Sequence, residues 1–246
     1  MSAPAPARVR VLASARFEAT TLLRNGEQLL VSVVLPLMAL VLLTFAPYPA
    51  LDGPRIDVVA PGVLALAVVS TAFTGQAIST GFDRRYGVLR LLGVSPLGRG
   101  GLLAGKALAV LVVLGVQVAV LGSVALGLGW RPDPAGLVPL VVSLVLGALC
   151  FVALALMLAG TLRAEAVLAV ANLLWVLFLG LGLLLPTATL PAAVGAVAAW
   201  LPSGLLGDAA RTAAVDGGWP VTAWLILLTW AVLAGLVARR TFRWSD

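Results

Sequence analysis

Six long apolar segments separated by polar gaps dominate the hydropathy pattern of this 246-residue chain. Most of them reach the roughly 20 residues that a helix needs to cross the hydrocarbon core of a bilayer. No Asp, Glu, Lys or Arg lies near the middle of any segment. The pattern therefore predicts an all-α polytopic membrane protein with six transmembrane helices in a single domain, residues 1–246. The predicted spans are Leu29–Phe45, Val58–Thr80, Ala107–Leu128, Leu137–Gly160, Ala166–Leu185 and Val221–Ala238.

Composition agrees with this interpretation and excludes several kinds of site. Charged residues make up 11% of the chain, whereas a soluble domain carries roughly 25%. The sequence contains no histidine, which excludes a histidine metal site, a histidine general base and a Ser-His-Asp triad. Its single cysteine, Cys150, excludes an intrachain disulfide.

The basic residues indicate how the chain is oriented. Of the 16 Lys and Arg residues, all but Arg55, Arg131 and Arg211 fall on one side of the predicted spans, while the 10 acidic residues divide equally. The positive-inside rule places the basic side in the cytoplasm. We therefore expect a multi-pass protein of the cell membrane with both termini, including the N-terminal segment 1–28, in the cytoplasm. Because the basic surplus follows the topology, it does not indicate nucleic-acid binding.

Two further segments are apolar but do not have the pattern of a span. Residues 8–24 mix apolar side chains with arginines, and an interfacial helix is one interpretation of them. In the external gap 186–220, residues 190–201 form an uncharged run bounded by Pro191 and Pro202. A run of this length is too short to span, and it is tolerated at membrane depth only when packed against protein. It predicts a short external re-entrant hairpin between spans five and six.

Polar residues within the spans are few and mostly uncharged. Thr71, Gly75 and Ser79 recur every four residues in span two, so they share one helix face. Small residues at this spacing let helices approach closely. We interpret this face as internal packing, a subunit interface or the wall of a substrate path. Ion-coupled transporters usually carry an ionisable residue at membrane depth, so its absence disfavours a secondary transporter.

One segment has the spacing of a phosphate-binding loop without its context. Such a loop follows a buried strand, and Ser or Thr follows its lysine. Gly100, Gly105 and Lys106 have the spacing, but Ala107 follows and the segment leads into a membrane span. We therefore expect this chain to bind no cofactor. ATP and magnesium, if used, must be bound by another polypeptide.

The gap between spans two and three, Gly81–Lys106, is the longest and most charged gap on the cytoplasmic side. It begins with charged residues, continues after Gly87 with an apolar strip, and stops at Ser95-Pro96. This order predicts a short helix with a surface to bury, and therefore a docking site. The charged residues are Asp83, Arg84 and Arg85, and the strip consists of Val88, Leu89, Leu91, Leu92 and Val94.

This stretch resembles a segment of the permease subunits of type-2 ABC exporters, especially the daunorubicin-resistance-type drug permeases. Those permeases carry E-R-E-x-G-[TV]-L-x-x-L-x-x-[TS]-P after the second span and G-K at the start of the third. Asp83, Arg84 and Gly87 match the first acid, the base and the glycine, whereas Arg85 replaces the second acid. The matches continue with Val88-Leu89, Ser95-Pro96 and Gly105-Lys106, and Leu201-Pro202 with Asp208-Ala209-Ala210-Arg211 is similar to a second family segment, L-P-x-x-x-x-x-x-x-A-[LV]-R.

The resemblance implies the membrane half of an ATP-driven exporter and not an enzyme. Two permeases, copies or paralogues, would pair in the bilayer, and each would rest on a soluble nucleotide-binding ATPase subunit that holds ATP and magnesium. Segment 81–106 would contain the coupling helix, with Asp83, Arg84, Arg85, Gly87, Val88, Leu89, Leu91 and Leu92 as the coupling residues. The hairpin at 186–220 would cap the transport path, with Pro202, Asp208 and Arg211 as an external gate near the outer surface.

The substrate is less defined than the class of protein. The apolar spans favour a hydrophobic or amphipathic molecule, such as a drug, a lipid or a lipid-linked molecule. A haem-export-type permease is an alternative, and so is a membrane scaffold protein that transports nothing and has no ATPase partner. A membrane-embedded enzyme is disfavoured because the spans lack histidine and acidic residues.

Overall fold

The structure is a computed structural model that describes residues 5–26, 30–48, 53–93 and 95–242. Among these residues the regular structure is helical throughout, as predicted. The α-helices are α1 (Ala7–Arg24), α3 (Leu35–Phe45), α4 (Arg55–Val68), α5 (Gln76–Arg85), α6 (Val88–Gly93), α7 (Gly98–Gly127), α8 (Leu137–Thr161), α9 (Ala164–Phe178), α10 (Ala192–Ala198), α11 (Pro202–Asp216) and α12 (Val221–Thr241). Three π-helical segments, η1 (Leu30–Val34), η2 (Val69–Gly75) and η4 (Leu179–Leu183), and two 3-10 turns, η3 (Pro134–Gly136) and η5 (Thr187–Thr189), adjoin them.

Five continuous helical segments of the described chain are long and apolar enough to cross a membrane. They confirm predicted spans two to six, although several helix ends extend into the predicted gaps. The described part of span one, Ser32–Phe45, is a shorter apolar helix, and its predicted start at Leu29 lies outside the described residues. The five long segments are Arg55–Arg85, Gly100–Gly127, Pro134–Thr161, Ala164–Leu183 and Val221–Thr241.

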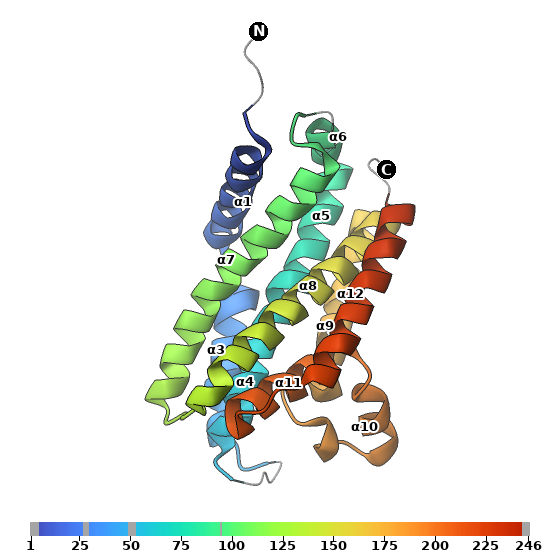
Figure 1. Cartoon of the computed structure of the whole chain (residues 1–246). Helices are drawn as coiled ribbons and strands as arrows, with labels where there is room; N and C mark the ends of the chain where they lie inside the picture. Colours follow the sequence, from blue (N-terminus) through green and yellow to red (C-terminus); the bar gives the residue numbers. More distant parts are fainter. Residues whose placement is uncertain (1–4, 27–29, 49–52, 94, 243–246) are drawn as a thin grey trace.

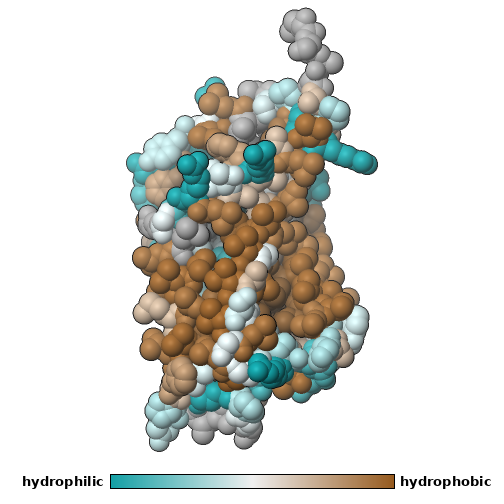
Figure 2. Space-filling view, turned by 90° about the vertical axis from the view of Figure 1, so that its left-hand side faces the viewer, coloured by the Kyte–Doolittle hydropathy of each residue, from teal (hydrophilic) through white to brown (hydrophobic). Residues whose placement is uncertain are grey.

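The spanning helices run between two distinct ends of one bundle (Figure 1). Both ends of the chain lie at the upper end in Figure 1, here called the termini end, together with α6. The helices α10 and α11 lie at the opposite end, here called the hairpin end. Figure 2 shows a broad apolar band between the two ends, with hydrophilic residues gathered toward each of them. A band of this size is typical of a surface that contacts lipid.

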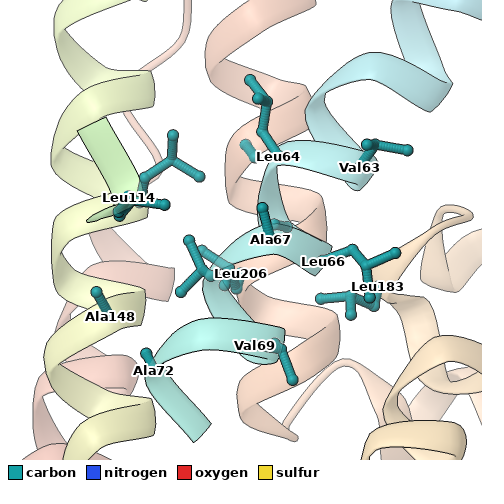
Figure 3. Close-up of a cluster of buried hydrophobic side chains, with 14 of the residues drawn as sticks. Val63, Leu64, Leu66, Ala67, Val69, Ala72, Leu114, Ala148, Leu183 and Leu206 are labelled. Atoms are coloured by element: carbon teal, nitrogen blue, oxygen red, sulfur yellow. The ribbon is translucent and has the colours of Figure 1, made fainter. Parts of the chain in front are cut away.

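Span two, which consists of α4, η2 and α5, forms the centre of the bundle. In its apolar window 89% of the residues are buried, compared with 17% in α12. Many of its residues are alanine, glycine or valine, which allow neighbouring helices to approach closely. Figure 3 shows its Ala67 and Ala72 among side chains contributed by α7, α8, η4 and α11. Spans one, three, four and five therefore pack around span two, whereas α12 packs against α8 and α11.

Aromatic side chains and polar pairs fix the orientation of the π-helical segment η2 in this core. Phe73 lies edge-on to Phe151 and Phe178, with ring centroids 6.1 and 5.6 Å away. Trp175 Nε1 donates a hydrogen bond to Ser70 Oγ at 2.9 Å. Edge-to-face rings and satisfied buried polar groups both favour one specific packing over its neighbours.

The N-terminal helix α1 packs along α7, whereas its apolar pattern suggested only an interfacial helix. Its residues Ala15, Ala19 and Leu22 are buried, and Ala19 and Leu22 form a cluster with two residues of α7. Gly105 of α7 makes this contact possible, because a Cβ atom there would lie 2.7 Å from Ser14 Oγ. The opposite side of α1 is exposed and carries Leu12 and Phe17 together with Arg16.

Between spans five and six the chain forms a sharply bent helix pair, and its buried helix lies later than the predicted run 190–201. The helices α10 and α11 meet at an angle of 88°. Residues of α10 are mostly exposed, whereas α11 is buried against α4 and α8. The helix α11 is rich in glycine and alanine, which pack closely but contribute little hydropathy, so its sequence does not stand out as an apolar run.

The contact between α11 and the start of α8 requires a glycine at position 136. A Cβ atom at Gly136 would overlap the backbone carbonyl of Ala213. We expect Gly136→Ala to destabilise the bundle by about 1–3 kcal/mol, because the backbone must move to relieve the overlap. Thermal unfolding in mild detergent measures this loss. Gly115→Ala is the matched control, since no atom lies within 4 Å of a Cβ there, and equal effects of the two substitutions would contradict the prediction.

Candidate functional site

A buried lysine joins three helices at the termini end. Lys106, near the start of α7, is only 1% exposed, and its Nζ lies 2.8 Å from Glu18 Oε1 of α1 and 3.1 Å from Asp83 Oδ2 of α5. A buried charge is tolerated only when it is paired and hydrogen-bonded. The predicted motif residues Asp83 and Lys106 therefore form one ionic cluster, together with an acid from the N-terminal segment.

The two arginines that follow Asp83 attach the end of α5 to other helices. Arg84 is buried and donates hydrogen bonds to the carbonyl oxygens of Ala159, at 2.7 Å, and Leu162 at the C-terminal end of α8. A cation is favourable there because the last carbonyls of a helix carry partial negative charge. Arg85 forms an exposed ion pair with Glu165 at the start of α9. The three charged residues predicted to set docking orientation are thus engaged within the chain.

The short helix α6 follows a sharp turn at the end of α5. Gly87 has φ +74°, a left-handed conformation that glycine adopts without steric strain. The helix begins directly afterwards at Val88, packs against α5 and α7, and ends before Ser95-Pro96. The sequence predicted a short helix in this gap, but placed its charged start inside it. Asp83 to Arg85 belong instead to the end of span two.

One residue of the predicted docking strip, Leu89, faces the interior of the bundle and not the surface. Leu89 is fully buried inside the chain, whereas Tyr86 and Leu91 are 71% and 72% exposed. Val88 is partly exposed. A six-residue helix has an inward and an outward face, so the strip cannot be apolar surface throughout. The side chain of Leu92 and residue Val94 lie outside the described part of the structure.

At the hairpin end a third buried cation, Arg211, lies at a break in span five. Arg211 of α11 is 6% exposed, and its guanidinium donates to the carbonyl oxygens of Gly182 at 2.6 Å, Leu183 at 3.1 Å and Leu185 at 3.0 Å. Span five leaves helical geometry at Leu181 and Gly182, where φ is −104° and +84°. Backbone carbonyls freed inside a membrane protein must find new donors. Arg211 supplies them.

Asp208 completes the network around Arg211, and two glycines leave space for the guanidinium group. Its carboxylate accepts from Arg211 Nη2 at 2.8 Å and from the Thr187 hydroxyl at 2.5 Å. Cβ atoms at Gly62 and Gly207 would lie 3.1 and 2.8 Å from the guanidinium. Arg211 therefore differs from the prediction, because it is enclosed by protein and not exposed at an outer surface. Pro202, the third predicted gate residue, is buried as the first residue of α11.

The three residues of the four-residue repeat in span two, Thr71, Gly75 and Ser79, have different surroundings. Thr71 is buried, and its Oγ1 accepts a hydrogen bond at 2.7 Å from Gln117, which also bonds the carbonyl of Ser32. Thr71 therefore packs inside the chain. Gly75 and Ser79 line a cavity of about 900 Å³ between α1, α5 and residues 95–97 at the termini end. Glu18 and Asp83 also line this cavity, so it is polar on one side.

The residues with the spacing of a phosphate loop lie inside a helix that continues into a membrane span. Gly100 to Lys106 lie within α7, so their backbone N–H groups are not arranged around a phosphate. Lys106 is already bound by two carboxylates. Within the residues that the structure describes, no group of three His, Cys, Asp or Glu side chains could hold a metal ion.

Sequence reasoning missed two participants in these clusters. Glu18 is an acidic residue in a segment rich in arginine. That was the available signal, because the buried Lys106 needs an acidic partner and Glu18 supplies one. Thr187 gave no signal, because its bond to Asp208 depends on how the hairpin folds back. Partners that are distant in sequence are set by tertiary packing and leave little local pattern.

The helical bundle, its apolar band and its buried ionic clusters define a polytopic membrane protein. The family model described as ABC-2 type transporter matches residues 9–214, which covers α1 to most of α11. The chain belongs to the ABC-2 type transporter family. It is therefore a permease subunit of an ABC transporter, embedded in the bilayer. A search of curated proteins found no match to this chain.

Lys106 provides a direct test of the cluster at the termini end. We expect Lys106→Met to destabilise the protein by about 3–5 kcal/mol, because Glu18 and Asp83 would face each other without a cation. Thermal unfolding in detergent measures the loss, and adding Glu18→Gln and Asp83→Asn should restore part of it. Arg85→Gln is the control, since an exposed ion pair contributes about 1 kcal/mol or less. A Lys106→Met protein as stable as Arg85→Gln would refute the buried cluster.

Proposed function

We propose that this chain is the membrane half of an ATP-driven exporter that moves a hydrophobic or amphipathic molecule out of the cytoplasm. The match to the ABC-2 type transporter family over residues 9–214 carries the proposal. The sequence has no complete nucleotide motif, which supports ATP hydrolysis by a separate soluble subunit. The apolar spans favour a drug, a lipid or a lipid-linked substrate over an ion.

The ATPase subunit docks on the outward face of α6 in this proposal. Tyr86, Val88 and Leu91 offer an exposed aromatic and apolar surface, and Arg85 and Arg90 beside them are also exposed. The positive-inside rule places this end in the cytoplasm, where a soluble ATPase is found. Leu89 has a different task from the one predicted, because its burial anchors α6 against the bundle.

The ionic contacts behind α6 give a route by which docking reaches the membrane helices. A displacement of α6 passes through Gly87 to the end of α5, which is tied to α1 and α7 by Lys106 and to α8 by Arg84. Buried charged contacts resist separation because an unpaired partner is strongly unfavourable. Rotation of the ATPase subunits would thus move several helices together and change access to the transport path.

The network of Arg211 serves as the external closure of that path. Arg211 connects α11 to the broken end of span five through three carbonyl groups. Asp208 of the same helix pairs with the guanidinium and accepts a hydrogen bond from Thr187. Opening the hairpin end would require these bonds to break or to move as one unit. This proposal assigns Pro202, Asp208 and Arg211 to a buried latch in place of an exposed gate.

A second permease copy packs against span five in this proposal. Asn172 lies on an exposed face of α9 about halfway along the span, and its side chain forms no hydrogen bond with any residue of the described chain. An amide in hydrocarbon is stabilised by a partner on a neighbouring helix. In a two-fold pair the two Asn172 side chains face each other and can bond reciprocally.

Leu91 tests the docking surface. We expect Leu91→Asp to reduce co-purification of the ATPase subunit at least tenfold, because the carboxylate would be buried without a partner in the interface. Membrane insertion and thermal stability should not change, since Leu91 is 72% exposed in the free chain. Val215→Asp, an equivalent change at an exposed residue of the hairpin end, is the matched control. Undiminished co-purification of the Leu91 variant would exclude α6 as the docking surface.

Asn172 tests the pairing of two permeases. Cys150 is the only cysteine, so Asn172→Cys in a Cys150→Ala background introduces a single thiol. We expect oxidation of this variant in membranes to produce a disulfide-linked dimer in high yield. Gly115→Cys, on an exposed part of α7, should remain mostly monomeric on the same gel. Crosslinking at Gly115 without crosslinking at Asn172 would place the second copy on a different face.

A further inference from the structure

A lateral groove runs between α7 and α12, with α8 as its floor. Its volume is about 790 Å³, and its lining is mainly apolar. The groove does not belong to either ionic cluster, and α9, which carries Asn172, contributes nothing to it. The lining includes Leu103 of α7, Val152 and Leu156 of α8, and Val232, Leu236 and Arg239 of α12.

Small residues make the groove hollow and leave it accessible from the bilayer. Ala153, Ala231 and Gly235 lie in its lining, and no atom lies within 4 Å of a Cβ built on Gly235. Val232 and Leu236 line the groove and are exposed at the same time. All three helices are membrane spans, so the medium that reaches this groove is lipid and not water.

A single cation marks one end of this apolar slot. Arg239 lies in the last turn of α12, at the termini end, and is exposed. Its guanidinium has no ion pair and no side-chain hydrogen bond to the residues that the structure describes. The last turn of a spanning helix lies near the level of lipid headgroups. Arginine presents a planar fork of donors that matches phosphate oxygens.

We propose that this groove binds one acidic phospholipid, with an acyl chain along α8 and the headgroup phosphate at Arg239. The apolar lining accommodates the chain, and the guanidinium of Arg239 selects for negative charge. Basic pockets between transmembrane helices bind anionic headgroups in this way. The lipid would join α7 to α12 across α8, as a component of the permease and not as its cargo. The proposal depends on the membrane location alone and not on the direction or substrate of transport.

Arginine substitutions test the headgroup contact. Native mass spectrometry of the purified chain, supplied with phosphatidylglycerol or phosphatidylcholine of equal chain length, counts the lipids retained. We expect wild-type protein to retain phosphatidylglycerol at least fivefold better, and Arg239→Gln to lose this preference. Arg240→Gln removes the same charge from the adjacent residue, which does not line the groove, and should keep the preference. If both variants lost the preference for phosphatidylglycerol equally, the preference would be due to general surface charge, and the assignment of the headgroup to Arg239 would be overturned.

Filling the groove tests the acyl-chain contact. Gly235→Trp, and Gly235→Leu as a smaller change, place a side chain in the groove and should reduce by one the number of tightly retained lipids of either type. Gly115→Trp, also with open space at its Cβ, is the control and should not change the count. An unchanged count in both Gly235 variants would overturn the proposal. The proposal would also be overturned if a Gly235 variant kept its lipids but no longer bound a second permease copy. That result would mean that protein, and not lipid, covers the groove.

Discussion

Buried cations with oxygen partners on other helices hold both ends of this bundle together. Apolar side chains give little preference among neighbouring helices in a bilayer, because lipid tails are equally apolar. Lys106 and Arg84 join α1, α5, α7 and α8 at the termini end, and Arg211 joins α11 to span five at the hairpin end. Loss of one partner leaves a charge or a carbonyl unpaired in a poorly solvated place. These contacts therefore determine which helix ends lie together, while shape and small residues determine the packing between them.

The spanning helices were predictable because the bilayer imposes a length and a composition on each of them. The ends and the hairpin were less predictable, for a reason that Arg211 illustrates. Counted as a loop residue by its charge, it is enclosed by carbonyls freed by the break at Leu181 and Gly182. That break has no local signal stronger than a glycine. In the same way, the apolar strip after Gly87 predicted a short helix, but the chain alone did not indicate that Leu89 faces inward.

In the function proposed above, the two ends of the bundle have different tasks. At the termini end, the exposed apolar surface of α6 lies beside helices that are joined by buried ionic contacts. This arrangement suits a surface that receives force from a soluble partner. The hairpin end contains a bent helix pair and a latch of main-chain hydrogen bonds, which suits a closure. Between them, span two touches most other helices, so a movement at one end reaches the other through the most buried segment of the protein.

The π-helical segment in the middle of span two affects how the two halves of that span are related. A π-helical turn takes in one residue more than an α-helical turn, and one residue corresponds to about 100° of rotation about the axis. The faces of α4 and α5 are therefore out of phase with each other. Thr71 bonds Gln117 in the core, whereas Ser79, eight positions later, borders the cavity beside α1. A helical wheel drawn straight through residues 69–75 would assign these two side chains to a common face. A sequence alignment that gains or loses one residue there would misplace the polar groups of α5 by about 100° relative to those of α4.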